Sequence, residues 1–355
     1  MGFITEGFHH VTLVCRDAQK TLLFYRDLLG LSLIKRTVNF DRPETYHLYF
    51  GDANGSPGSI LTFFEWPDAP KGAFGVGGIH HIALKTNDDE TLLKWKRRLT
   101  DSGVPVSGPY NRGWFHSIYF KDPDGQVLEI ATLGPGYDLD EPIDALGQQI
   151  KMPPEGQLRG HRDEASIAAQ TYDQPVSVIS DDMDLRMIHH VTGFTDNLET
   201  ANALYEEALG MRIIKKSVNQ DDPNTLHYFW ANYDGTQVSP ASSMTLFGWP
   251  SDARTAREGT GQTHHIAFRA KGDEQQEEWR EHLIALGYDV SPVRNRNYFM
   301  SIYFRSHDGL LIEIATDGPG FAVDEDPATL GTKLMLPEWL EGQRESITAR
   351  LRPLQ

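Results

Sequence analysis

The chain of 355 residues has a single cysteine, Cys15, and contains no run of 18 apolar residues. One cysteine cannot build a disulfide framework or a cysteine zinc site within one chain, so histidine and carboxylate side chains must hold any metal. The N-terminus also lacks a basic leader followed by a long apolar run. These absences predict a soluble, cytoplasmic protein with no membrane partner.

The chain also has fewer basic than acidic residues. The chain has 33 Lys and Arg against 50 Asp and Glu, which gives a formal net charge of −17, and the acidic residues are spread along the sequence. A phosphate backbone needs a basic surface, so this balance argues against nucleic acid as a partner. The length suits about two domains of roughly 150 residues each.

The chain is an internal duplication. Four histidine pairs open apolar, strand-like segments, and the pair at His10 returns 180 positions later at His190, while the pair at His81 returns 184 positions later at His265. The segments 111–120 and 128–136 also return at 295–304 and 312–320. Because each half holds two histidine pairs, the chain is predicted to contain four similar modules.

The first module shows the expected order of elements. A strand near 8–15 precedes Asp17, a candidate N-cap, and the helical spacing of residues 18–29 ends at Gly30. Strand-like runs follow at 31–39, 46–50 and 59–65, so the module reads βαβββ. The other helices are expected near 90–101, 198–209 and 274–286.

Domain boundaries follow from the repeat. We expect an N-terminal domain at 1–135, a partly packed linker at 136–184, a C-terminal domain at 185–320 and an extension at 321–355. The linker contains Pro153-Pro154-Glu155-Gly156 and is long for a simple loop.

Glu313 lies inside the otherwise apolar segment 310–316, and Glu129 lies in the matching segment 128–132. An ionised carboxylate in such a strand is costly unless it is paired or bound to a metal. Alternate side chains of a strand share a face, so one histidine of each pair can face a site while its neighbour packs behind. The pairs alone are explained equally well as a structural repeat, but two imidazoles with one carboxylate form the facial triad that suits non-haem Fe(II).

The βαβββ modules, the His-His strand openings and the Asp122-Pro123-Asp124-Gly125 turn before Leu128-Glu129-Ile130 resemble the vicinal oxygen chelate superfamily. That superfamily includes glyoxalases, bleomycin-resistance proteins and extradiol ring-cleaving dioxygenases. Segments 8–12, 35–37, 46–50 and 55–58 resemble its hydroquinone-type dioxygenases. The resemblance implies an α+β fold in which four βαβββ modules form curved mixed sheets around metal-binding cavities.

The resemblance also implies a site. Its metal ligands fall on His10, His265 and Glu313, with Fe(II) as the expected ion and Mn(II) as the second choice. Four further residues are expected around the metal: Thr12, His264, Arg296 and Tyr303. An arginine there steadies a developing phenolate, a tyrosine hydrogen-bonds a substrate oxygen, and a histidine moves a phenolic proton. The expected function is an Fe(II)-dependent, extradiol-type cleavage of a hydroquinone or catechol with O₂.

Several alternatives stay open on the sequence alone. A second set, His81, Glu129 and His190, occupies the matching positions of the repeat and could also bind a metal. Pairing of the third and fourth modules would instead combine His190 with His265 and Glu313. The bulky side chains of Trp114 and His116 are expected to fill or remodel the second cavity. The oligomeric state, including a homo-oligomer, is also open.

Two other functions are consistent with the same superfamily. One is a glyoxalase-like, metal-dependent isomerase or lyase, and the other is a binding protein of the bleomycin-resistance type. In glyoxalases both paired modules supply a carboxylate, whereas Thr62 is expected at one of those positions here and Thr245 at its repeat. Three protein ligands instead of four favour the oxygenase.

Overall fold

The computed structural model describes residues 3–355. The chain divides into two compact units. Unit 1 is built mainly from Phe74–Asp122 and Gln126–Ala256, and unit 2 from Phe8–Ala73, Pro123–Gly125 and Arg257–Gln355. Across residues 3–355, no helix is both long enough and apolar enough to span a membrane.

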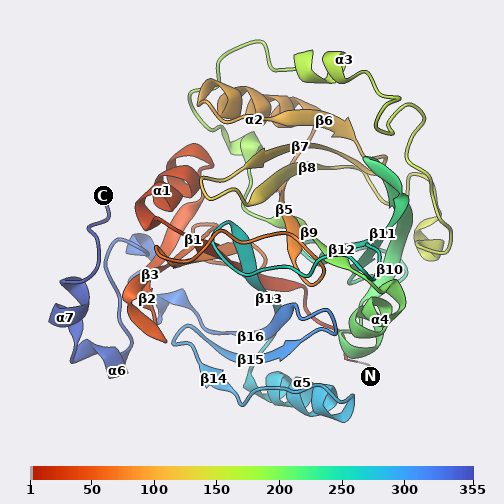
Figure 1. The fold of residues 1–355 in the computed structure, drawn as a ribbon. Helices are drawn as coiled ribbons and strands as arrows, with labels where there is room; N and C mark the ends of the chain where they lie inside the picture. The colour runs from red at the N-terminus through yellow and green to blue at the C-terminus, as the bar shows by residue number, and fades with distance from the viewer. Residues whose placement is uncertain (1–2) are drawn as a thin grey trace. The chain divides into compact units, whose positions relative to one another are not determined.

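Unit 2 contains a sheet of eight strands from the first and fourth modules. Its order is β14-β15-β16-β13-β1-β4-β3-β2. The strands are β1 (Phe8–Cys15), β2 (Ser32–Asn39), β3 (Arg42–Gly51), β4 (Ile60–Glu65), β13 (Gln262–Ala270), β14 (Arg294–Asn295), β15 (Phe299–Arg305) and β16 (Leu311–Pro319). The modules meet where β1 runs antiparallel to β13, so strands from opposite ends of the chain lie side by side (Figure 1).

Unit 1 repeats this plan with the second and third modules, in the order β10-β11-β12-β9-β5-β8-β7-β6. Its strands are β5 (Ile79–Thr86), β6 (Ser107–Asn111), β7 (Phe115–Lys121), β8 (Val127–Pro135), β9 (Ile188–Thr195), β10 (Arg212–Asn219), β11 (Asp222–Ala231) and β12 (Ser243–Gly248). Here β5 runs antiparallel to β9. In both sheets the first and last strands of each module are parallel.

One helix follows the first strand of every module. The module helices are α1 (Ala18–Leu22), which continues as a π-helical turn over Leu23–Leu28, α2 (Asp89–Asp101), α4 (Leu198–Asn202), which continues over Ala203–Ala208, and α5 (Asp273–Ala285). Asp17 accepts hydrogen bonds from the backbone of Gln19 and Lys20, as an N-cap should, and Gly30 ends the first helix with a φ of 74°. The prediction of an α+β fold with four βαβββ modules is therefore confirmed.

The compact units differ from the predicted domain ranges 1–135 and 185–320. Those ranges follow the sequence duplication, whereas each unit combines one module from each half. The physical reason is that the first strand of a module leaves one edge unpaired, and that edge is paired with a strand from the other half. The segments after each half join the units too, with α3 (Glu164–Ala169) in unit 1, and α6 (Glu338–Glu341) and α7 (Arg344–Thr348) in unit 2.

A buried lysine ties each of these segments to its sheet. Lys35 on β2 is fully buried, and its Nζ lies 2.6 Å from Asp324 Oδ1 and 2.5 Å from Glu325 Oε2. The same Nζ lies 4.8 Å from the centre of the Tyr298 ring. Lys215 repeats the arrangement in unit 1 with Asp140 and Glu141. A buried ammonium is tolerated because these carboxylates neutralise it.

Replacing Lys35 with Met is expected to lower the free energy of unfolding by about 3 kcal/mol or more, since it leaves the buried carboxylate of Glu325 without its cation. Urea denaturation measures this change. The matched control, Lys20→Met, removes an exposed lysine and should change the free energy by less than about 0.5 kcal/mol. A similarly small change for Lys35→Met would contradict the role given to this buried cluster.

Candidate metal centre

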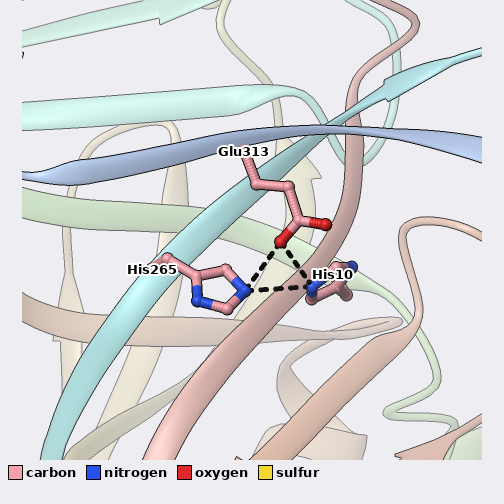
Figure 2. A group of neighbouring side chains, drawn as sticks. All are labelled: His10, His265 and Glu313. Atoms are coloured by element: carbon pink, nitrogen blue, oxygen red, sulfur yellow. Dashed lines mark hydrogen bonds and ion pairs between the residues drawn. The ribbon is translucent and has the colours of Figure 1, made fainter. Parts of the chain in front are cut away.

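Three strands of unit 2 place His10, Ala267 and Glu313 in one row across the sheet. His10 on β1 is paired with Ala267 on β13, and Ala267 is paired with Glu313 on β16. The methyl group of Ala267 is small enough for the longer side chains on either side to meet above it. His265 lies two residues before Ala267 and therefore on the same face, so all three candidate ligands converge (Figure 2).

The neighbouring row shows why the site has one carboxylate. His265 is paired with no acid across β1 and β4, because the residues in register with it are Thr12 and Thr62. The two rows are related by the approximate symmetry of the two modules, which puts Thr62 where the fourth module has Glu313. The sequence alignment predicted this exchange.

The three converging atoms are Nε2 of each histidine and Oε2 of the glutamate. The two Nε2 atoms are 3.2 Å apart, and Oε2 lies 3.4 Å from His10 Nε2 and 2.8 Å from His265 Nε2. Ligand atoms about 2.1 Å from one metal ion and at right angles to each other are about 3.0 Å apart. All three side chains are buried. The spacing fits three ligands on one face of a metal ion.

The first histidine of each pair determines which nitrogen of the second carries a proton. His9 Nδ1 lies 2.8 Å from His10 Nδ1, and His9 also donates to the backbone carbonyl of Thr316. A neutral His9 that donates through Nε2 has a bare Nδ1, so the proton between the two rings belongs to His10 Nδ1. His10 Nε2 therefore presents a lone pair to the site.

His264 has the same relation to His265. Its Nδ1 lies 2.7 Å from His265 Nδ1, and its Nε2 lies 3.1 Å from Glu258 Oε1. The carboxylate accepts the Nε2 proton of His264, which leaves Nδ1 to accept from His265. Both histidines thus direct Nε2 at the point that Glu313 Oε2 also faces, which is how ligands of one cation are arranged. The residues present fit a metal ion.

The protonation states agree with this assignment. Burial lowers the pKa of His265, and it lowers the pKa of His9 to about 3, so both rings are neutral at pH 7. Burial alone would raise the pKa of Glu313, but His10 and His265 hold it well below its usual value. Neutral imidazoles and an ionised carboxylate are the forms that bind metal.

Arg296 and Tyr303 lie together beside the triad, as predicted. Tyr303 is paired with Glu313 across β15 and β16, and its hydroxyl accepts a hydrogen bond from Arg296 Nε at 3.0 Å. Burial and the charge of Glu313 raise the pKa of Tyr303, so its phenol keeps its proton and remains a donor. Arg296 also reaches Asp41 Oδ2 at 3.3 Å.

Thr12 belongs to a hydrogen-bonded chain next to the triad. Its hydroxyl lies 2.9 Å from that of Thr62, and Thr62 lies 2.9 Å from His47 Nε2. The chain ends where the Tyr49 hydroxyl lies 3.1 Å from His47 Nδ1. Neither His47 nor Tyr49 is assigned a role from the sequence, because the link depends on pairing between β3 and β4.

Unit 1 assembles the second set in the same way. His190, Ala83 and Glu129 form the row, and His81 Nε2 lies 3.2 Å from His190 Nε2. Glu129 Oε2 lies 2.8 Å from His81 Nε2 and 3.1 Å from His190 Nε2. Structure thus pairs the first module with the fourth, and the second with the third, so that His190 is not a partner of His265 within one sheet.

Of the two outcomes expected for Trp114 and His116, filling the second cavity is wrong, whereas Trp114 does contribute to the cavity wall. Unit 1 has a cavity of about 1040 Å³ beside His81 and His190. Trp114 lies in its wall, held by a hydrogen bond from Nε1 to Asp140 Oδ1. His116 points elsewhere, with Nδ1 2.6 Å from Asp89. Alternation along β7 turns the His116 side chain to the opposite face from Phe115, which lines the cavity.

Comparison with known proteins agrees with this architecture. The family model of the Glyoxalase/Bleomycin resistance protein/Dioxygenase superfamily matches residues 7–130 and 187–314. The chain belongs to this superfamily.

Within the superfamily, the chain is similar over nearly its whole length to ring-cleaving enzymes. It is 33% identical to the Bacillus subtilis protein named "Putative ring-cleaving dioxygenase MhqO", covering 99% of this chain and 97% of that one. It is 28% identical to the chlorohydroquinone/hydroquinone 1,2-dioxygenase of Sphingobium indicum, covering 96% and 94%. A crystal structure titled as a "putative dioxygenase" from Bacillus subtilis has a TM-score of 0.78 at 32% identity, covering 100% and 99%. These relatives confirm the predicted enzyme class, a ring-cleaving dioxygenase.

Sequence reasoning did not identify Ala267 and Ala83. A signal for them exists, because alanine stands two residues after the second histidine in the modules that carry the glutamate, and threonine stands there in the other two. The sequence also left His9 without a role. Its contact with His10 through Nδ1 depends on side-chain rotation that alternation along a strand does not reveal.

Neutral buried histidines make stability depend on pH. The pKa values of His9, His80 and His189 are lowered to about 3, chiefly by burial, against 6.5 for an exposed histidine. As the pH falls, these histidines bind protons in the unfolded chain before they do so in the folded protein. The stability that comes from keeping them neutral is therefore complete above pH 6.5 and is lost as the pH falls toward 3. Each contributes a slope of about 1.4 kcal/mol per pH unit within that window.

In the metal-free protein, His9→Asn is therefore expected to reduce the slope of unfolding free energy against pH by about 1.4 kcal/mol per unit between pH 6 and 4. Asn keeps an acceptor near Nδ1 but does not titrate. Urea denaturation at several pH values, with chelator present, provides the slopes. His161→Asn at an exposed position is the control and should leave the slope as it is; an equal effect of both substitutions would exclude the buried histidine as the source.

Proposed function

We propose that unit 2 binds Fe(II) through His10, His265 and Glu313 and cleaves the ring of a hydroquinone or catechol with O₂ in the extradiol manner. The observation that carries the proposal is the convergence of two bare imidazole nitrogens and one carboxylate oxygen within 3.4 Å. The hydroquinone relative supports the substrate class. Mn(II) is the second candidate ion because the donors are the same.

The number of ligands separates this proposal from a glyoxalase-like lyase. Thr62 occupies the position that mirrors Glu313, and its hydroxyl is engaged by Thr12 and His47. Three protein ligands on one face leave open positions for both substrate and O₂. When bound, Fe(II) supplies the acceptor for a phenolate oxygen and the electrons that activate O₂.

The chain's own residues hold the substrate and handle its protons. Tyr303, protonated and next to Glu313, donates a hydrogen bond to a substrate oxygen, and Arg296 stabilises negative charge that develops there. His264 holds His265 in the tautomer that binds a metal. The Nε2 atom of His264 donates its proton in a hydrogen bond to the half-exposed Glu258. The hydroxyl chain from Tyr49 to Thr12 fixes the opposite wall.

The central test is oxygen uptake after anaerobic loading with Fe(II). Unsubstituted hydroquinone or catechol should be consumed with one O₂ per ring. Glu313→Gln, which removes the ligand charge but keeps its shape, should lower uptake about tenfold or more. Glu278→Gln, at an exposed helix position, is the matched control. No uptake with any hydroquinone or catechol, in protein shown to contain iron, would falsify the proposed function.

Ala267 provides a second test of the same centre. Ala267→Val adds two methyl groups between His10 and Glu313, so the two ligand atoms cannot approach as closely. Iron affinity at this centre should fall about 10-fold to 100-fold, as it does when groups that orient metal ligands are lost. Competition with a metal-binding dye measures it. Ala270→Val, on the same strand but the opposite face, controls for overpacking of the sheet.

A further inference from the structure

We propose that unit 1 is a second metal centre, in which His81, Glu129 and His190 hold Fe(II) beside a cavity that takes an aromatic diol with an apolar substituent. The proposal rests on the proposed function for the nature of the ion and the diol. The site itself rests on separate residues, none of which belongs to the unit 2 centre.

The ligand geometry of unit 1 meets the same requirements. Its three donor atoms lie 2.8, 3.1 and 3.2 Å apart, a narrower range than in unit 2. His189 and His80 contact the Nδ1 atoms of His190 and His81 at 2.8 and 2.6 Å, and His189 donates to the carbonyl of Thr132. The bond to Thr132 leaves His189 Nδ1 to accept from His190, so His190 presents Nε2 to the carboxylate as a ligand does, and His81 Nε2 faces the same carboxylate oxygen.

Supporting residues are also present. Ala83 separates His190 from Glu129, as Ala267 separates the unit 2 ligands, and Thr245 stands in the place of a fourth ligand with its hydroxyl 2.7 Å from Thr192. Tyr119 is paired with Glu129, and the partly buried Arg112 lies 5.0 Å from the Tyr119 ring centre.

The cavity wall has diverged toward apolar side chains. Phe74 stands at the position that Glu258 occupies in unit 2, and its ring centre lies 5.5 Å from that of His80. Phe194 replaces Val14, and its ring centre is 3.9 Å from that of Trp249. Together with Phe247, these rings line the cavity on the His80 side.

This wall defines the ligand class. The Glu258 carboxylate favours water and polar groups, whereas the Phe74 ring at the corresponding position excludes water and gains from contact with apolar carbon. The volume of about 1040 Å³ accommodates a ring with a bulky substituent. We expect the unit 1 centre to prefer an alkylated hydroquinone or catechol over the unsubstituted compound.

Iron stoichiometry tests the second centre independently of activity. After anaerobic loading and desalting, the wild type should contain two Fe(II) per chain, Glu129→Gln one, Glu313→Gln one, and the double variant none. Ala83→Val, which blocks the row without removing a ligand, should also contain one. Circular dichroism on each variant verifies folding, and His116→Ala, which alters a unit 1 histidine outside the set, should keep two.

One iron in the wild type that persists in Glu129→Gln and Ala83→Val would overturn the second centre and leave the proposed function intact. One iron that persists in Glu313→Gln and is lost in Glu129→Gln would support the second centre and overturn the proposed function of unit 2. The two failures are therefore distinguishable.

Anaerobic calorimetry tests the ligand class with iron-loaded Glu313→Gln, which retains the unit 1 centre. A tert-butyl hydroquinone should bind about tenfold or more tightly than hydroquinone, and Phe74→Glu should reduce that preference. Equal affinities for the two compounds would overturn the assigned ligand class. Iron-loaded Glu129→Gln, in which unit 2 carries the metal, serves as the comparison and should show the weaker preference.

Discussion

Two neutral imidazoles and one carboxylate, held in a buried sheet with their lone pairs directed at one point, are the constraint on which the rest of the structure depends. His9 and His264 fix the tautomers of His10 and His265 through Nδ1 contacts. The result is a centre organised in advance for a cation, in which binding needs little rearrangement.

Each sheet pairs two modules that are far apart in the sequence. His10 and His265 are 255 positions apart and come within 3.2 Å because β1 and β13 are neighbours in one sheet. The segments after each half are held to their own sheets by Lys35 and Lys215, which bring pairs of carboxylates against otherwise apolar surfaces. Each unit is therefore complete in its sheet, its ligands and its covering segment.

Duplication has kept the ligands and changed the walls. The triads, the spacing alanines and the threonines are the same in both units, while Phe74 replaces Glu258 and Phe229 replaces Tyr49 around them. The candidate ligand sets therefore match in the two units, while the side chains around them differ.

Periodicity, turn residues and the repeat predicted the βαβββ modules from the sequence alone, and the family resemblance implied the candidate ligands and Thr62 at the position that mirrors Glu313. Tertiary structure decided what depends on strand pairing and rotamers: the partnership of the first module with the fourth, the roles of His9 and Ala267, and the open cavity beside Trp114. The periodicity of apolar residues along a strand predicts the face of the sheet on which a side chain lies. Which strand lies next to it depends on contacts between residues hundreds of positions apart.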